Sequence, residues 1–195
     1  MTGGEGNGAV RVQALTLEQI RGLYAQRLKR DFPPDELKPL SRIERALARG
    51  EYACYGAFDG EAILAYAFFV LLGRHALFDY YAVDAALRDR GIGSRFIHAL
   101  IEGPLADMDC VLLEVDDPDS APSPEEAGVR RRRLAFYLRN GLVETGVRAT
   151  VYGVDYAILS LPVGNRPDPE ETRRVYAELY RAILPPRLYE RWVIL

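Results

Sequence analysis

The stretch from Arg88 to Ser94 combines basic side chains with two glycines at the start of a helix-like segment. A β-like run ends before it near Val83, and apolar residues recur after it at the spacing of one helical face, at Ile92, Phe96, Ile97, Leu100 and Ile101. Gly91 and Gly93 let a ligand approach the backbone closely, and the free N–H groups of a helix start attract negative charge. The pattern predicts an anion site, with a pyrophosphate as the expected guest.

Two carboxylates are candidates for acid–base chemistry. Glu114 lies in the apolar strand predicted over Cys110–Val115, where alternation places Leu112, Glu114 and Asp116 on one face. Asp79 lies in the preceding β-like run, predicted on the same face as Tyr81 and Val83. Glu114 has a structural alternative, an ion pair with Arg130 or Arg133.

The first half of the chain predicts two helices followed by three strands. Thr16 and Gln19 form a capping box for a helix that ends near Asp31, and Pro39 breaks or delays a second helix over Leu37–Arg49. Asp59-Gly60 marks a tight turn between strands, so an antiparallel set is expected over Tyr52–Phe58, Ile63–Leu72 and Ala76–Val83.

The second half predicts a helix from the glycines to about Gly103, the Cys110–Val115 strand, a further helix and two strands. Ser123 caps the further helix, and Gly141 ends it. The strands follow over Leu142–Thr150 and Val151–Leu161. A last amphipathic helix begins after Asp168 and ends at Pro185-Pro186.

Composition bounds the class of protein. The chain has 195 residues, a net charge of -3 and 49% hydrophobic residues, which predicts one globular domain and argues against a nucleic-acid binder. No apolar run is long enough for a membrane span, and the N-terminus has no signal-peptide pattern, so a cytoplasmic location is expected. Cys54 and Cys110 are expected to be buried free thiols, and no spacing predicts a metal site.

The order of elements resembles the GCN5-related N-acetyltransferase (GNAT) superfamily, over roughly Val10–Pro162. Arg88-Asp89-Arg90-Gly91-Ile92-Gly93 is similar to the family's acyl-CoA motif, Arg/Gln-x-x-Gly-x-Gly/Ala. Phe136-Tyr137-Leu138-Arg139-Asn140-Gly141-Leu142 is similar to its Leu-Tyr-x-x-x-Gly-Phe segment. The resemblance implies an α/β fold with a mixed, mostly antiparallel central sheet flanked by helices. We expect a disordered N-terminus over 1–9, a domain over 10–162, and a C-terminal helical extension over 163–195 packed on it.

The resemblance further implies acetyl-CoA as acyl donor, without a metal. Backbone groups of Tyr81, Ala82 and Val83 would pair with the pantetheine arm as an added strand. The pyrophosphate would be held by the loop, with Phe136 and Arg139 as further contacts; the loop residues are Arg88, Asp89, Arg90, Gly91, Ile92, Gly93 and Ser94. Tyr137 occupies the position of the general acid for the departing thiolate, since a phenol keeps its proton at neutral pH.

The acceptor implied by these residues is a primary amine of a small molecule, acetylated by direct attack. Glu114 is the expected base, Asp79 is its competitor, and Asp116 can help to attract a cation. Arg133 lies four residues before the tyrosine, where many family members have a small residue, and can clamp an anionic group or serve as a structural partner of Glu114. Phe32 belongs to a turn over Asp31–Asp35 that suits a lid and a plain helix break equally well. The alternatives are a protein N-terminus or lysine as acceptor, or an acyl-CoA sensor without catalysis. A monomer or homodimer is expected.

Overall fold

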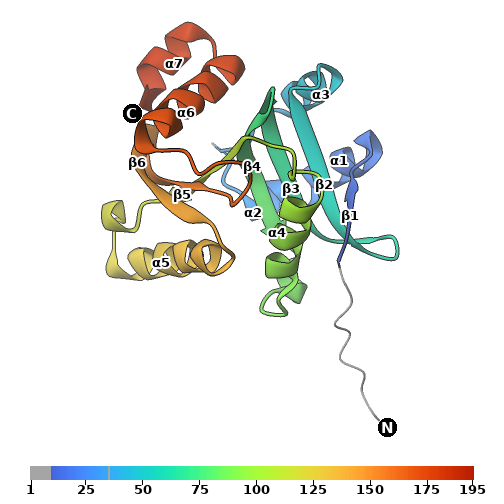
Figure 1. Ribbon diagram of the computed structural model, residues 1–195. Helices are drawn as coiled ribbons and strands as arrows, with labels where there is room; N and C mark the ends of the chain where they lie inside the picture. The colour runs from blue at the N-terminus through green and yellow to red at the C-terminus, as the bar shows by residue number, and fades with distance from the viewer. Residues whose placement is uncertain (1–9, 35) are drawn as a thin grey trace.

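A computed structural model describes residues 10–34 and 36–195, and its centre is a twisted sheet with helices on both faces (Figure 1). The segment 1–9, for which the sequence predicts disorder, lies outside the described residues. So does Asp35, at the end of the predicted lid.

Eight strands form the sheet within the described residues, in the spatial order β1-β2-β3-β4-β5-β7-β6-β8. Neighbours are antiparallel except for β4 and β5, which are parallel. This confirms the mixed, mostly antiparallel sheet. The strands are β1 Arg11–Ala14, β2 Tyr52–Asp59, β3 Ala62–Leu72, β4 His75–Val83, β5 Cys110–Asp116, β6 Val143–Val151, β7 Val154–Ser160 and β8 Val193–Ile194.

The helices begin at the caps that the sequence predicts. Thr16 forms the capping box with Gln19, and Ser123 and Asp168 each accept a backbone N–H three residues ahead. A π-helical turn over Tyr24–Leu28, helix α7 and strand β8 were not predicted. The helices are α1 Leu17–Leu23, α2 Lys29–Asp31, α3 Leu40–Ala48, α4 Ile92–Glu102, α5 Pro124–Arg139, α6 Pro169–Ile183 and α7 Pro186–Trp192. Within the described ranges, none is long and apolar enough to cross a membrane.

The sheet separates two hydrophobic cores. One core joins side chains of α1, α3 and α6 to one face of the sheet, with Tyr66, Phe68 and Tyr176 at its centre. The other joins α4 and α5 to the opposite face, with Phe96 fully buried. We call these the α6 face and the α4/α5 face. Cys54 and Cys110 are buried and unpaired, as predicted.

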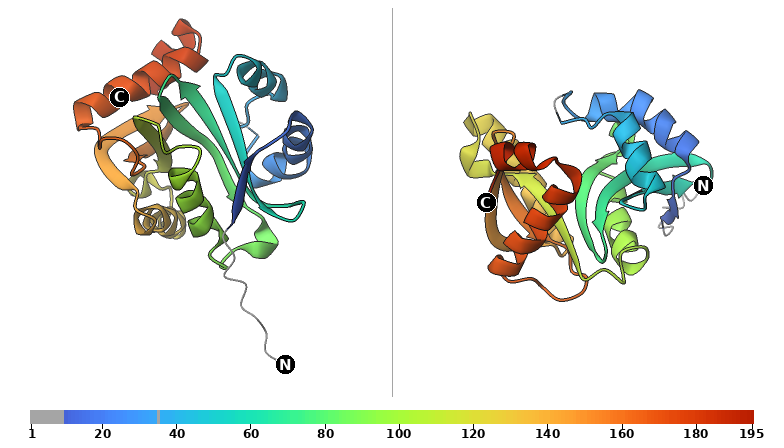
Figure 2. Two further views of the ribbon diagram at one scale, coloured as in Figure 1. Left: turned by 45° about the vertical axis from the view of Figure 1, so that its right-hand side comes forward. Right: turned by 90° about the horizontal axis from the view of Figure 1, so that it is seen from above.

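The parallel strands β4 and β5 diverge partway along their length. Backbone pairing joins His75–Phe78 to Cys110–Leu113 and then stops, although both strands continue. Beyond that point β4 pairs with β3, and β5 pairs with β7. The facing edges of 79–83 and 114–116 therefore have no strand partner. Helix α6 contacts β3, β4 and β6, and Figure 2 (right) shows it between the two halves of the sheet.

A β-bulge in β4 corrects one sequence prediction. Phe68 pairs with Tyr80 and Phe69 pairs with Phe78, so Asp79 is the extra residue of the bulge. An extra residue reverses the alternation of side chains. Asp79 therefore lies on the α6 face, whereas the side chains of Tyr81 and Val83 lie on the α4/α5 face. The prediction that the three share a face is wrong.

Helix α6 depends on its N-terminal cap, which gives the first test. The Asp168 side chain accepts from the Glu171 N–H at 2.8 Å. Replacing it in Asp168→Ala leaves that donor without its partner, and we expect the free energy of unfolding to fall by about 1 kcal/mol. Asp168→Asn, which retains a capping oxygen, should stay within a few tenths of a kcal/mol of wild type. Urea denaturation measures both, and an equal loss in the two variants would contradict the capping role.

Candidate active site

The glycine-rich loop has the conformation that the sequence predicts for an anion site. Gly91 has a φ of 71°, a left-handed conformation that glycine adopts without strain, and directly precedes α4. Asp89 also has a positive φ, of 62°, so the loop turns sharply before the helix. Arg88 and Arg90 are exposed beside it. Two exposed basic residues thus lie within four positions of Ile92, where the first free N–H groups of α4 begin.

Gly93 sits where three elements meet. An added Cβ would lie 3.1 Å from the Phe136 ring of α5, and 3.3 Å from both the Tyr81 hydroxyl and the Val83 side chain of β4. The Tyr81 hydroxyl donates to the Gly93 carbonyl at 2.6 Å. The structure therefore brings together predicted cofactor-binding residues from β4, α4 and α5. Their shared position borders the unpaired edge of β4.

Tyr137 lies on the same face, next to these residues. Its ring centroid is 6.3 Å from that of Tyr81 and 5.2 Å from that of Phe136. Burial raises the pKa of Tyr137 to about 12, although the nearby Arg133 guanidinium opposes the shift. Within the described chain, no group accepts a hydrogen bond from its hydroxyl. The phenol is thus protonated at neutral pH, and its O–H makes no hydrogen bond to another described residue.

The arginines of α5 do not pair with Glu114. Arg133 pairs with Asp116 at 2.6 Å, and Arg130 binds the Asp117 carbonyl at 3.0 Å and pairs with Glu126. The predicted alternative, an ion pair of Glu114 with either arginine, is wrong. The reason is geometric: Asp116 at the end of β5 lies nearer to α5, whereas Glu114 faces α6.

Glu114 is held by α6. The hydroxyls of Tyr176 and Tyr180 both donate to its Oε1, the latter at 2.6 Å. Burial raises the pKa of Glu114, while the two hydroxyl donors and the more distant Lys38 oppose that rise. Burial raises the pKa of both tyrosines as well, so each keeps the proton it donates.

Asp79, the competing carboxylate, is already occupied on both oxygens. Its Oδ1 pairs with the Lys38 ammonium, and its Oδ2 accepts from the Tyr52 hydroxyl. Its side chain is 8% exposed. Phe32 lies close by, edge-on to Tyr80 with the ring centroids 4.9 Å apart. Asp79, Glu114 and Phe32 therefore gather on the α6 face, apart from Tyr137.

Sequence reasoning missed the partners of both carboxylates. Each partner lies 27 to 66 residues along the chain from the carboxylate that it binds. The partners are Lys38 and Tyr52 for Asp79, and Tyr176 and Tyr180 for Glu114. The spacing of Tyr176 and Tyr180, one helical turn apart, was a usable signal for a shared face of α6. It did not identify the strand that this face meets.

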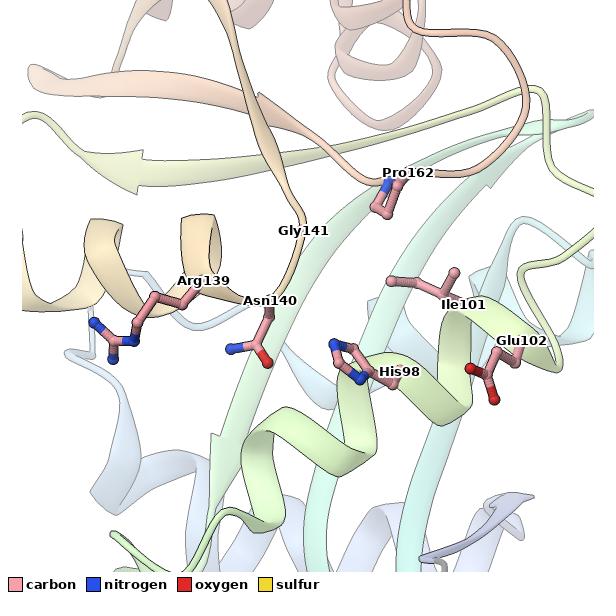
Figure 3. Close-up of a pocket in the computed structure, with 7 residues that line it drawn as sticks. All are labelled: His98, Ile101, Glu102, Arg139, Asn140, Gly141 and Pro162. Atoms are coloured by element: carbon pink, nitrogen blue, oxygen red, sulfur yellow. The ribbon is translucent and has the colours of Figure 1, made fainter.

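Arg139 lines a different hollow from the loop. A surface pocket of about 380 Å³ lies between the second half of α4 and the end of α5 (Figure 3). Its lining contains neither Tyr137 nor Glu114; it consists of His98, Ile101, Glu102, Arg139, Asn140, Gly141 and Pro162. The role of Arg139 as a cofactor contact stays a prediction.

Comparisons with known proteins agree with this architecture. The sequence model of the acetyltransferase (GNAT) family matches residues 17–123, more than half of the chain. Comparison with curated proteins gives no match. Segments beyond residue 123, including all of α5 and α6, lie outside the matched range.

Solved structures show the same fold at low sequence identity. A GNAT-family protein from Bacteroides thetaiotaomicron has a TM-score of 0.68 and 21% identity, covering 89% of this chain and 98% of its own. The ribosomal-protein-S18-alanine N-acetyltransferase from Escherichia coli has a TM-score of 0.57 and 17% identity, covering 80% and 96%. An aminoglycoside 6'-N-acetyltransferase complexed with coenzyme A has a TM-score of 0.56 and 14% identity, covering 81% and 99%.

The close packing around Gly93 predicts opposite effects for two glycine substitutions. Gly93→Ala places a methyl group against three elements at once, and we expect the free energy of unfolding to fall by about 1 kcal/mol because overpacking outweighs the gain in helix propensity. Gly22→Ala, in α1, meets nothing within 4 Å and should raise it by about 0.5 kcal/mol. Urea denaturation compares the two, and a stabilising Gly93→Ala would contradict the tight junction.

Proposed function

The chain belongs to the acetyltransferase (GNAT) family. We propose that it transfers the acetyl group of acetyl-CoA directly to a primary amine of a small molecule. The observation that carries the proposal is the position of α6. This helix contacts β3, β4 and β6 and supplies both hydroxyls that hold Glu114. Helix α6 would thus cover the side of the diverging strands from which the acceptor approaches.

Acetyl-CoA, which the family uses, supplies the acetyl group as a thioester, and the residues at the glycine-rich loop fit it. Gly91 and the N–H groups at the start of α4, flanked by Arg88 and Arg90, would hold the pyrophosphate. The unpaired edge of Tyr81–Val83 would bond to the pantetheine amides. The close packing of Gly93 against Phe136 would form one wall of the CoA site.

Charges on the acceptor side favour a cationic amine. Asp79 is neutralised by Lys38, and Asp116 by Arg133. Among the described residues, Glu114 has no ion-pair partner and remains a half-buried carboxylate. A carboxylate in such a place attracts a positively charged group. Because Arg130 and Arg133 already bind protein oxygens, the residues give less support to an anionic group beside the amine.

Glu114 and Tyr137 divide the proton chemistry. Glu114 would accept the proton of the amine, directly or through a water, and a pKa raised by burial makes it a stronger base. Tyr137 would donate to the sulfur as the C–S bond breaks. A phenol with a pKa of about 12 holds its proton more tightly than a thiol of pKa about 8.5, so its main contribution would be a hydrogen bond to the developing thiolate.

An acceptor on a protein N-terminus or lysine side chain needs a groove that admits an extended peptide. The contacts of α6 with strands on both sides of the divergence disfavour such a groove. A cytoplasmic location, and a monomer or homodimer, stay predictions.

The proposal is tested by CoA release across a panel of amines. We expect release of free thiol and a mass increase of one acetyl group with small primary amines, and no reaction with peptides that carry a free N-terminus or lysine. Transfer to peptides alone would favour the protein-acceptor alternative. Calorimetric binding of acetyl-CoA without transfer to any member would favour a sensor.

The role of Tyr137 predicts a selective loss of turnover. In Tyr137→Phe we expect kcat to fall about a hundredfold while the Kd for CoA stays near wild type, because the ring remains and the donor is removed. Tyr152→Phe, at the exposed β6–β7 turn, serves as the matched control and should retain full turnover. Steady-state kinetics and calorimetry measure both variants, and wild-type kcat in Tyr137→Phe would remove its role.

A further inference from the structure

The C-terminal helix α6 places two tyrosines on one carboxylate oxygen. Tyr176 and Tyr180 are one turn apart on the helix, with ring centroids 4.8 Å from each other. Tyr176 is fully buried, and Tyr180 is 7% exposed. Because both rings are packed in the core of the α6 face, their hydroxyls are fixed in place.

The two carboxylate oxygens of Glu114 differ in their hydrogen bonds. Both hydroxyls donate to Oε1. In the described part of the chain, no group donates to Oε2. The carboxylate is thus anchored through one oxygen, and the other keeps its lone pairs for an external donor.

The surroundings of Glu114 contain several other titratable groups. Lys38 favours its charged form, and Asp79 opposes it, but these two are paired with each other. Burial, and to a lesser extent the charge of Glu114, raise the pKa of Tyr156 on β7, but Tyr156 makes no hydrogen bond to Glu114. On the α6 side, the direct stabilisation of the carboxylate therefore comes from Tyr176 and Tyr180.

We propose that Tyr176 and Tyr180 are positioning residues of the acetyl-transfer site, which orient Glu114 through Oε1 and present Oε2, in its charged form, to the acceptor amine. This inference rests on the proposed function, in which Glu114 is the base. It assigns a reaction role to a helix that lies beyond the residues matched by the family. The extension then completes the active site as well as packing on the sheet.

The sign of the effect follows from the direction of the bonds. A hydroxyl that donates to a carboxylate stabilises the charged form and lowers its pKa. Removing either hydroxyl leaves Glu114 buried, which raises its pKa, and takes away one of the two hydrogen bonds that lower it. The pKa of Glu114 should therefore rise further, and the pH at which the base becomes active should rise with it.

The test is a pH titration of the Glu114 carboxyl carbon by NMR in protein labelled at glutamate, with the resonance assigned by its absence from Glu114→Gln. We expect the midpoint to move upward by about one pH unit in Tyr176→Phe and in Tyr180→Phe, and further in the double variant. The acid limb of kcat/KM against pH should move in the same direction. Tyr189→Phe, on α7, is the matched control and should leave the midpoint unchanged.

Each outcome decides a separate point. Tyr180→Phe keeps the ring of a residue that is 7% exposed. An unchanged midpoint in this variant would overturn the inference even if Tyr176→Phe did not fold. Wild-type turnover in Glu114→Gln would overturn the proposed base, and with it the reaction role of the tyrosines. Loss of turnover in Glu114→Gln, together with the upward shifts, supports both.

Discussion

The candidate site takes its position from the divergence of β4 and β5. After Phe78 and Leu113 the two parallel strands no longer pair, and each continues beside its other neighbour. An interruption of this kind leaves unsatisfied backbone donors and acceptors in the middle of a sheet, where pairing is otherwise the rule. The bulge at Asp79 falls at the start of the divergence and changes the face on which the following side chains lie. The break in the sheet thus creates an edge inside the fold that can bind an extended ligand.

The two faces of this break carry different chemistry. The α4/α5 face offers the glycine-rich loop and the protonated phenol of Tyr137. The α6 face carries two carboxylates. Asp79 is neutralised by Lys38, and Glu114 accepts hydrogen bonds from tyrosine hydroxyls of α6. In the proposed reaction, the donor would approach from the α4/α5 face and the acceptor from the α6 face, so the two would not compete for the same contacts. Because α6 holds Glu114, the proposed function gives this helix a place on the acceptor side of the site.

Local signals predicted most of the fold and the glycine-rich turn before α4. The cap at Thr16, the Asp59-Gly60 turn and the glycines before α4 each act within a few residues, so the sequence shows them directly. The bulge at Asp79 was missed because one inserted residue leaves no clear mark on an apolar strand. The bonds of α6 to Glu114 were missed because they join residues 62 and 66 positions apart. Packing between distant segments decides such contacts.

We propose that donor and acceptor meet at the break between β4 and β5, and a crystal structure of the chain with CoA would show whether they do. In that structure we expect the pantetheine arm to run along the edge of Tyr81–Val83, with its sulfur within about 3.5 Å of the Tyr137 hydroxyl. A CoA molecule bound elsewhere, such as in the pocket beside His98 and Arg139, with its sulfur remote from Tyr137, would rule out this placement of the donor.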